Sequence, residues 1–304
     1  MRAIAMALLL ALVQPAFAAE KAQPSGCALE RYSSMPISTL SDGRIAIPVT
    51  VQGRNASFMV DTGGVSATMT MQLAKDIDKA PKPAARWLGG VGGSLLTTFI
   101  YADSFSIGRL TGKDLIVYID PRINGMGIDG TLAPDMLGRF DVDIDFARGT
   151  LSLFSPSHCP GKVVYWTQGE HITVPMDVAP SGHIRVPVTV DGKTVMATLD
   201  TGSVISVMSM SLAKSIGVAE NSPDLKLKRS YGINGRFKEY SYPFKTLALD
   251  GLTVTNPHIK LLSDEMLGGK LGSDLILGVG ILRQLHLYIS YKEEKIYITP
   301  ALAN

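Results

Sequence analysis

Residues 58–64 read Phe-Met-Val-Asp-Thr-Gly-Gly, and residues 197–203 read Ala-Thr-Leu-Asp-Thr-Gly-Ser. A single Asp-Thr-Gly is a weak signal, because aspartate and glycine are common in ordinary turns. Here the flanks match as well, since residues 43–51 align with residues 182–190 without a gap. Equivalent positions stand a constant 139 residues apart, from 61 to 200 for example, so one structural unit was duplicated whole.

The composition is that of a globular protein with room for two hydrophobic cores. The chain has 304 residues, of which 46% are hydrophobic and 18% are charged. Basic residues number 29 against 27 acidic ones, and no basic run alternates with aromatic residues. We therefore expect no nucleic-acid partner.

The first 18 residues are typical of a secretory signal peptide. Arg2 precedes an apolar run at residues 4–13, and Ala16-Phe17-Ala18 has the small-x-small pattern of a cleavage site. An uncleaved anchor is the alternative, but the apolar run is too short to cross a bilayer. We expect residues 1–18 to be removed and the mature protein to be exported, with no stable membrane insertion.

The sequence has two cysteines, Cys27 and Cys159, and exported proteins meet oxidising conditions. They do not occupy equivalent positions in the two copies. A disulfide would tie the start of the mature chain to the segment just after the first copy. Two free thiols are the alternative.

Each copy reads mainly as β-strand. Apolar residues alternate along residues 45–51, a glycine turn follows, and residues 56–60 form the expected return strand. Asp61 therefore lies at a strand end, where a loop begins. Short helices are expected at residues 72–78 and 211–216.

Each copy also has a glycine-rich turn between two expected strands, and such a turn allows the backbone to approach a ligand closely. An ordinary surface hairpin is the alternative, but its occurrence in both copies favours a function. The candidate ligand-contacting residues are Gly90, Val91, Gly92, Gly93, Gly232, Ile233, Asn234 and Gly235.

Residues 155–161, Ser-Pro-Ser-His-Cys-Pro-Gly, are the best linker in the chain. After the signal peptide we expect an N-terminal segment at residues 19–35, a first lobe at 36–155, a linker at 156–165 and a second lobe at 166–304.

Two copies of one fold commonly pack about a pseudo-twofold axis, where residues meet their own equivalents. If Asp61 and Asp200 meet there, the two carboxylates cannot both ionise easily, and the pair shares one proton. The ionised group can then take a proton from water while its partner donates one to a carbonyl oxygen. A structural turn at each strand end is the alternative.

With these motifs the chain resembles the retropepsin-like and pepsin-like aspartic proteases, in particular the bacterial exported type with two retropepsin-like lobes in one polypeptide. The resemblance rests on the two Asp-Thr-Gly motifs, a glycine-rich turn in each copy, and Ile276-Leu277-Gly278 before a short helix. It implies a mainly β fold of two homologous β-barrel lobes related by pseudo-twofold symmetry. Paired aspartates that share a proton are the known behaviour of this family.

The resemblance also implies specific roles. Asp61 and Asp200 would be the catalytic pair, and the glycine-rich turns would fold over an extended peptide or protein substrate. Active-site support would come from Thr62, Gly63, Thr201, Gly202 and Ser203. Residues 151–154 and 296–299 are the candidates for strand pairing between the lobes. We expect a monomer, periplasmic or secreted, with no cofactor and no metal.

The chain departs from the family pattern at a few positions. Gly64 stands where a hydroxyl or methyl side chain is usual, whereas Ser203 keeps its hydroxyl, which predicts unequal hydrogen bonding of the two carboxylates. Ala133 replaces the glycine that Gly278 provides in the second copy, and Tyr231 is the nearest match to a flap tyrosine.

The sequence thus predicts an aspartic endopeptidase, with two alternatives. One is a non-catalytic peptide-binding module that retains the fold, and two intact Asp-Thr-Gly motifs argue against it. The other is an assembly in which lobes pair between chains. Residues 125–130 match a dinucleotide fingerprint as a string but lack the strand–helix context, so we interpret them as a loop.

Overall fold

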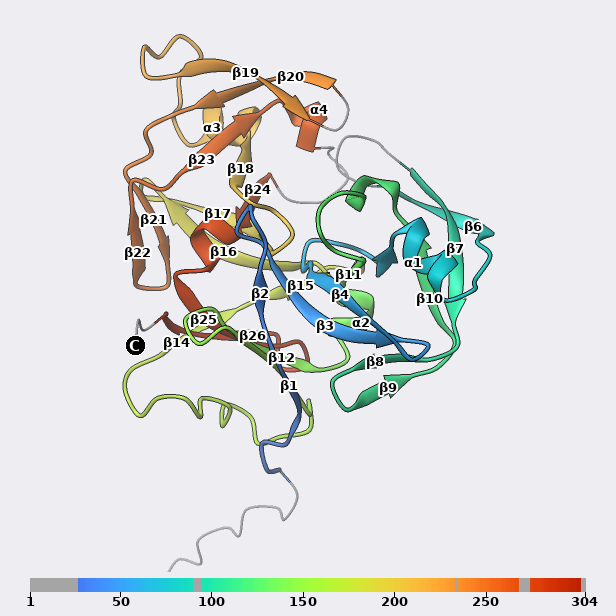
Figure 1. Cartoon of the computed structure of the whole chain (residues 1–304). Helices are drawn as coiled ribbons and strands as arrows, with labels where there is room; N and C mark the ends of the chain where they lie inside the picture. Colours follow the sequence, from blue (N-terminus) through green and yellow to red (C-terminus); the bar gives the residue numbers. More distant parts are fainter. Residues whose placement is uncertain (1–26, 90–94, 233–234, 268–273, 302–304) are drawn as a thin grey trace, which may run out of the picture.

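The computed structural model describes residues 27–89, 95–232, 235–267 and 274–301 (Figure 1). The predicted signal peptide lies outside the described residues. So do the turn residues Gly90, Val91, Gly92, Gly93, Ile233 and Asn234.

The fold is mainly β, and each copy of the duplicated unit forms its own sheet with the same strand order. The first sheet runs β6-β7-β10-β5-β11-β4-β3-β8-β9 and the second runs β19-β20-β23-β18-β24-β17-β16-β21-β22, with β2 and β15 added at equivalent places. Figure 1 shows the first sheet in blue to green and the second in yellow to orange. The two sequence repeats therefore form two sheets of the same topology.

The strands of the first sheet are β2 (Ser38–Thr39), β3 (Ile45–Val51), β4 (Arg54–Val60), β5 (Thr68–Met69), β6 (Lys82–Gly89), β7 (Leu95–Ala102), β8 (Phe105–Ile107), β9 (Leu110–Gly112), β10 (Leu115–Ile119) and β11 (Gly130–Leu132). Those of the second are β15 (Asp177–Val178), β16 (Ile184–Val190), β17 (Lys193–Asp200), β18 (Ser206–Ser209), β19 (Lys226–Gly232), β20 (Gly235–Ser241), β21 (Thr246–Leu249), β22 (Leu252–Thr255), β23 (Ile259–Leu262) and β24 (Leu275–Gly278).

The hairpin that leads to each Asp-Thr-Gly has a local cause. In the first copy Gln52 and Gly53 have φ values of 49° and 79°, and in the second Asp191 and Gly192 have 45° and 81°. Two central residues with positive φ form the two-residue turn that suits the twist of paired strands. This turn sets the register of each hairpin and so the strand end from which the aspartate emerges.

Short helices flank the sheets: α1 (Met71–Asp76), α2 (Pro134–Leu137), α3 (Met210–Ser215), α4 (Asp264–Leu267), α5 (Val279–Leu282) and a 3-10 turn, η1 (Pro121–Ile123). The predicted helices correspond to α1 and α3. Each begins one residue earlier because a hydroxyl caps it, Thr70 accepting from the Leu73 amide and Ser209 from the Leu212 amide. None of the helices in the described ranges is long and apolar enough to span a bilayer.

A third sheet joins the two copies. Its strands are β1 (Arg31–Pro36), β12 (Asp141–Asp145), β13 (Thr150–Phe154), β14 (Ile172–Pro175), β25 (Leu285–Ser290) and β26 (Lys295–Pro300). The order β1-β13-β12-β25-β26-β14 is symmetric about the β12–β25 pair, which places the pseudo-twofold axis between these two strands.

The predicted pairing of residues 151–154 and 296–299 between lobes is wrong. Those residues belong to β13 and β26, which pair with β12 and β25 of their own halves and, on the outer side, with β1 and β14. Tight hairpins turn β13 and β26 outward, so the preceding strands, β12 and β25, meet at the centre.

The expected linker, residues 156–165, contains neither helix nor strand, although the proposed domain boundaries remain predictions. It packs over the joining sheet, and a disulfide connects Cys27 with Cys159. His158 Nε2 lies 2.5 Å from Asp141 Oδ2, and on the same face His286 Nε2 lies 2.5 Å from Asp143 Oδ1. The carboxylates of β12 are buried, and their burial is tolerable because imidazoles, the hydroxyls of Tyr165 and Tyr288 and the Arg148 amide bond them.

We expect Asp141→Ala to lower the free energy of unfolding by about 3 kcal/mol or more, because it leaves the buried His158 imidazole without its carboxylate. Denaturant unfolding measures the change. The control is Asp177→Ala, which removes a carboxylate paired with Arg185 but 54% exposed, where about 1 kcal/mol or less is expected. Equal losses in the two variants would contradict the role given to the buried pair.

Candidate active site

The two aspartates emerge from equivalent strand ends. Asp61 follows β4, and its amide donates to the Leu132 carbonyl of β11 at 2.9 Å. Asp200 is the last residue of β17, opposite Gly278 in the parallel pair with β24. In both lobes the strand beside the motif runs parallel to it, so the peptide units around each carboxylate are held by the sheet.

Beneath the carboxylates, Thr62 and Thr201 join the lobes by reciprocal hydrogen bonds. The Thr62 hydroxyl donates to the Leu199 carbonyl at 2.8 Å and accepts from the Thr201 amide at 3.1 Å. The Thr201 hydroxyl donates to the Val60 carbonyl at 2.7 Å and accepts from the Thr62 amide at 3.1 Å. Both threonines are 1% exposed. Each loop is thereby fixed by the opposite lobe.

The glycines of the motif bring the carboxylates together. A Cβ atom on Gly63 would lie 2.2 Å from Asp200 Cγ, and one on Gly202 would lie 2.5 Å from Asp61 Cγ. Any side chain there would collide, so each loop backbone packs directly on the carboxylate of the other lobe. The structure thus places Asp61 and Asp200 beside each other, within hydrogen-bonding reach.

Backbone amides lower the pKa of each carboxylate, whereas burial raises it. The Gly63 amide donates to Asp61 Oδ1 at 3.1 Å, and the Gly202 amide donates to Asp200 Oδ1 at 2.8 Å. These bonds favour ionisation, but burial outweighs them and raises the pKa of Asp61. Burial first, and the charge of Asp61 second, raise the pKa of Asp200 to about 8.

The departures from the family pattern compensate each other sterically. A Cβ on Gly64 would lie 3.1 Å from the Ala133 methyl. The first lobe therefore has a methyl group at position 133 and none at position 64. In the second lobe a Cβ on Gly278 would lie 2.4 Å from the Ile205 carbonyl oxygen. In the second lobe, therefore, the loop backbone itself leaves room only for glycine at position 278.

The Ser203 hydroxyl donates to the Ile205 carbonyl at 2.8 Å, within its own loop. Two backbone amides favour ionisation of the carboxylate in each lobe. They are those of Gly63 and Gly64 for Asp61, and those of Gly202 and Ser203 for Asp200. The predicted inequality in hydrogen bonding is therefore not what distinguishes the carboxylates, because the hydroxyl is used by the loop.

Three basic residues near the motif were missed by the sequence reasoning. Arg44 Nη1 donates to the Gly202 carbonyl at 3.4 Å. Arg122 and His183 lie close enough to Asp61 to favour its ionisation electrostatically. Arg44 and His183 stand 139 residues apart in the aligned flanks, so the repeat could have singled them out.

The glycine-rich turns are described only at their bases. The hairpins β6–β7 and β19–β20 occupy equivalent ends of the two sheets, and Gly232 pairs with Gly235 where the second hairpin narrows. The side chain of Tyr231 lies outside the description. A role for these hairpins over a substrate remains a prediction.

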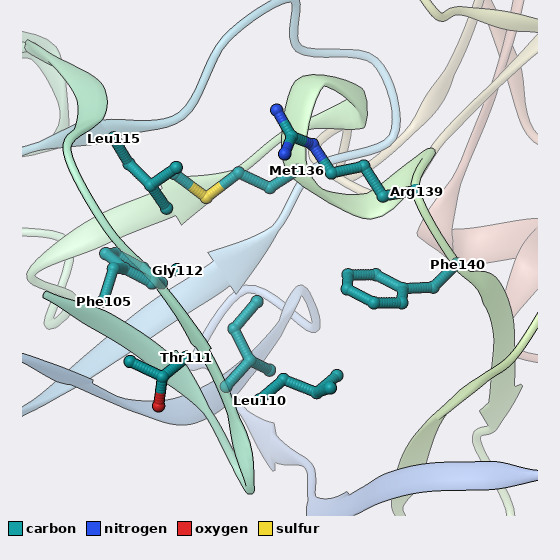
Figure 2. A pocket seen from close by; sticks show the side chains of 9 residues that line it. Phe105, Leu110, Thr111, Gly112, Leu115, Met136, Arg139 and Phe140 are labelled. Atoms are coloured by element: carbon teal, nitrogen blue, oxygen red, sulfur yellow. The ribbon is translucent and has the colours of Figure 1, made fainter.

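A separate apolar pocket of about 160 Å³ lies in the first lobe between β8, β9 and α2. Figure 2 shows Phe105, Leu110, Met136 and Phe140 around it, with Arg139 at one side. None of its lining residues belongs to an Asp-Thr-Gly loop. Within the described ranges, no three His, Cys, Asp or Glu side chains are grouped as metal ligands.

Comparison with known families agrees with the geometry. A family model described as aspartyl protease matches the chain twice, at residues 47–136 and 186–280. A search of curated proteins finds no match. Each match contains one Asp-Thr-Gly and its supporting strands, and together they cover more than half of the chain. The chain belongs to the aspartyl protease family and carries two copies of its domain.

Replacing either interlocking threonine should loosen the lobe contact. We expect Thr62→Val or Thr201→Val to lower the free energy of unfolding by about 1–3 kcal/mol, because each leaves a buried carbonyl and a buried amide without their partner. Thermal or denaturant unfolding reads this out. Thr189→Val is the matched control, since its hydroxyl bond to Thr194 is exposed. A loss no larger than that of the control would refute the contact's importance.

Proposed function

We propose that the protein is an aspartic endopeptidase that hydrolyses peptide bonds with a water molecule activated between Asp61 and Asp200. The observation that carries the proposal is the contact of each motif glycine with the opposite carboxylate, 2.2 Å and 2.5 Å from a virtual Cβ to Cγ. A pair of half-buried carboxylates this close has few structural uses. Family membership supports the same reaction class.

The two acids divide the chemistry. At neutral pH a pKa of about 8 keeps the proton on Asp200, which is set to donate to the carbonyl oxygen of the scissile bond. Asp61 then acts as the base and takes a proton from the water that attacks the carbonyl carbon. The proton pattern then reverses as the tetrahedral intermediate collapses and the leaving nitrogen is protonated. The apparent pKa values belong to the pair, because the groups titrate together.

The substrate class follows from the fold. An extended peptide between the lobes, covered by the glycine-rich hairpins, would gain main-chain hydrogen bonds, with side-chain pockets supplying selectivity. One chain carries both aspartates, so we propose a monomer as the active form. Export after removal of residues 1–18, to the periplasm or outside the cell, is part of this proposal.

Asp61→Asn and Asp200→Asn should each lower peptide cleavage by roughly a thousandfold or more, since each removes one half of the acid–base pair. The assay is cleavage of a diverse peptide pool by the chain from residue 19, read by mass spectrometry. Asp103→Asn, on an exposed carboxylate that pairs with Lys79, controls for loss of charge alone. Turnover that survives in either dyad variant would rule out this mechanism.

The pH profile provides a second test. Because the pKa of Asp200 is raised to about 8, the proton it donates is present below that pH and lost above it. We expect kcat/KM to be sustained near neutral pH and to fall about tenfold per pH unit above pH 8. Activity confined to pH values below about 5 would show that the burial of Asp200 does not set its acidity.

A further inference from the structure

The apolar pocket of the first lobe has no part in the proposed reaction. It lies between the β8–β9 hairpin and α2, and its volume is about 160 Å³ (Figure 2). An apolar cavity of about 150 Å³ is large enough to bind benzene. The pocket can therefore hold one aromatic ring. Its apolar lining comes from Phe105, Ile107, Leu110, Leu115, Met136 and Phe140.

The second lobe has the same hairpin, so it shows which side chains the fold accepts there. Phe105 lies opposite Gly112 in the first hairpin, and Leu247 lies opposite Val254 in the second. A Cβ atom on Gly112 would lie 2.9 Å from Leu115 Cδ1, and both residues line the pocket. The glycine thus leaves open a space that a valine side chain would fill. Glycine at this position is a feature of the first lobe and not a need of the fold.

A cation stands at the rim of the pocket where the second lobe has a neutral residue. Arg139 Nε donates to the Asp135 carbonyl at 3.3 Å, and Gln284 Nε2 donates to the Gly280 carbonyl at 3.4 Å. These equivalent bonds show that a neutral amide serves the helix end as well as a guanidinium does. The bond therefore does not account for the charge of Arg139, which is exposed and lines the pocket.

Two other polar groups beside the pocket are already engaged. The Thr111 hydroxyl lies 2.8 Å from the Ser106 hydroxyl. The Asp135 carboxylate accepts the Ala67 amide at 3.0 Å, on the loop that follows β4. Arg139 is thus the lining residue suited to a charged ligand, and a guanidinium matches a carboxylate in both charge and shape.

We propose that this pocket binds a small aryl carboxylate, with the ring between Phe105 and Phe140 and the carboxylate paired with Arg139. The volume limits the apolar part to one ring, and the single cation of the lining matches one negative charge. None of the lining residues belongs to an Asp-Thr-Gly loop. The inference therefore goes beyond the proposed function and does not depend on it.

The test is a titration of the mature chain with hydrocinnamate, in which a short alkyl chain joins a phenyl ring to a carboxylate. Methyl NMR of Met136, which lines the pocket, reports binding. Gly112→Val copies the residue at position 254. It should weaken binding by roughly tenfold or more, because the valine side chain takes the space of the ring.

Arg139→Gln copies the residue at position 284 and keeps the apolar walls. It should weaken hydrocinnamate binding roughly fivefold, because the ion pair at the rim is lost. The binding of neutral hydrocinnamyl alcohol should stay as in the parent. Arg109→Gln is the matched control. Arg109 is an exposed arginine of the same hairpin that bonds the Tyr32 carbonyl and does not line the pocket, so its loss should preserve the affinity for the acid.

The absence of a saturable Met136 shift in the parent would overturn the inference. So would an unchanged affinity for hydrocinnamate in folded Gly112→Val or in Arg139→Gln. If Gly112→Val does not fold, the comparison of Arg139→Gln with Arg109→Gln still decides, since both residues are exposed. No peptide cleavage enters these measurements, so their outcome is separate from that of the proposed function.

Discussion

The structure depends on the reciprocal hydrogen bonds of Thr62 and Thr201. Each hydroxyl serves a carbonyl and an amide of the opposite lobe, so neither Asp-Thr-Gly loop is complete alone. The bonds draw the two loops close enough for each motif glycine to rest on the other lobe's carboxylate. The lobe contact thus removes much of each carboxylate from water beside the other one, and the raised pKa values follow from this.

Much of this could be predicted from the sequence because the duplication is a local signal. The repeat of Asp-Thr-Gly with its hairpin predicted two lobes, the strand ends that carry the aspartates, and the approach of Asp61 to Asp200. The central strands of the joining sheet could not be predicted, since alternation of apolar residues marks a strand but not its neighbour. The His158–Asp141 contact, 17 residues apart, likewise depends on where the linker lies.

Local reasoning also misjudged the departures from the family pattern. Gly64 and Ala133 each look like a weakened motif when viewed alone, yet a Cβ on Gly64 would lie only 3.1 Å from the Ala133 methyl, so the glycine leaves room for that methyl. The two lobes thus differ in these side chains, while the packing of each loop on its neighbouring strand is kept. The same holds for Arg44 and His183, whose equivalence was visible in the aligned flanks but whose proximity to the opposite loops only the packing reveals.

The most direct test of the account is a ¹³C NMR titration of the Asp200 carboxyl in the folded chain and in Asp61→Asn. The account predicts a midpoint near pH 8 in the parent, as burial and Asp61 set it, and a lower midpoint once the Asp61 charge is gone. A midpoint near the ordinary aspartate value of about 4 in both proteins would contradict it, because the two carboxylates would not share a buried site.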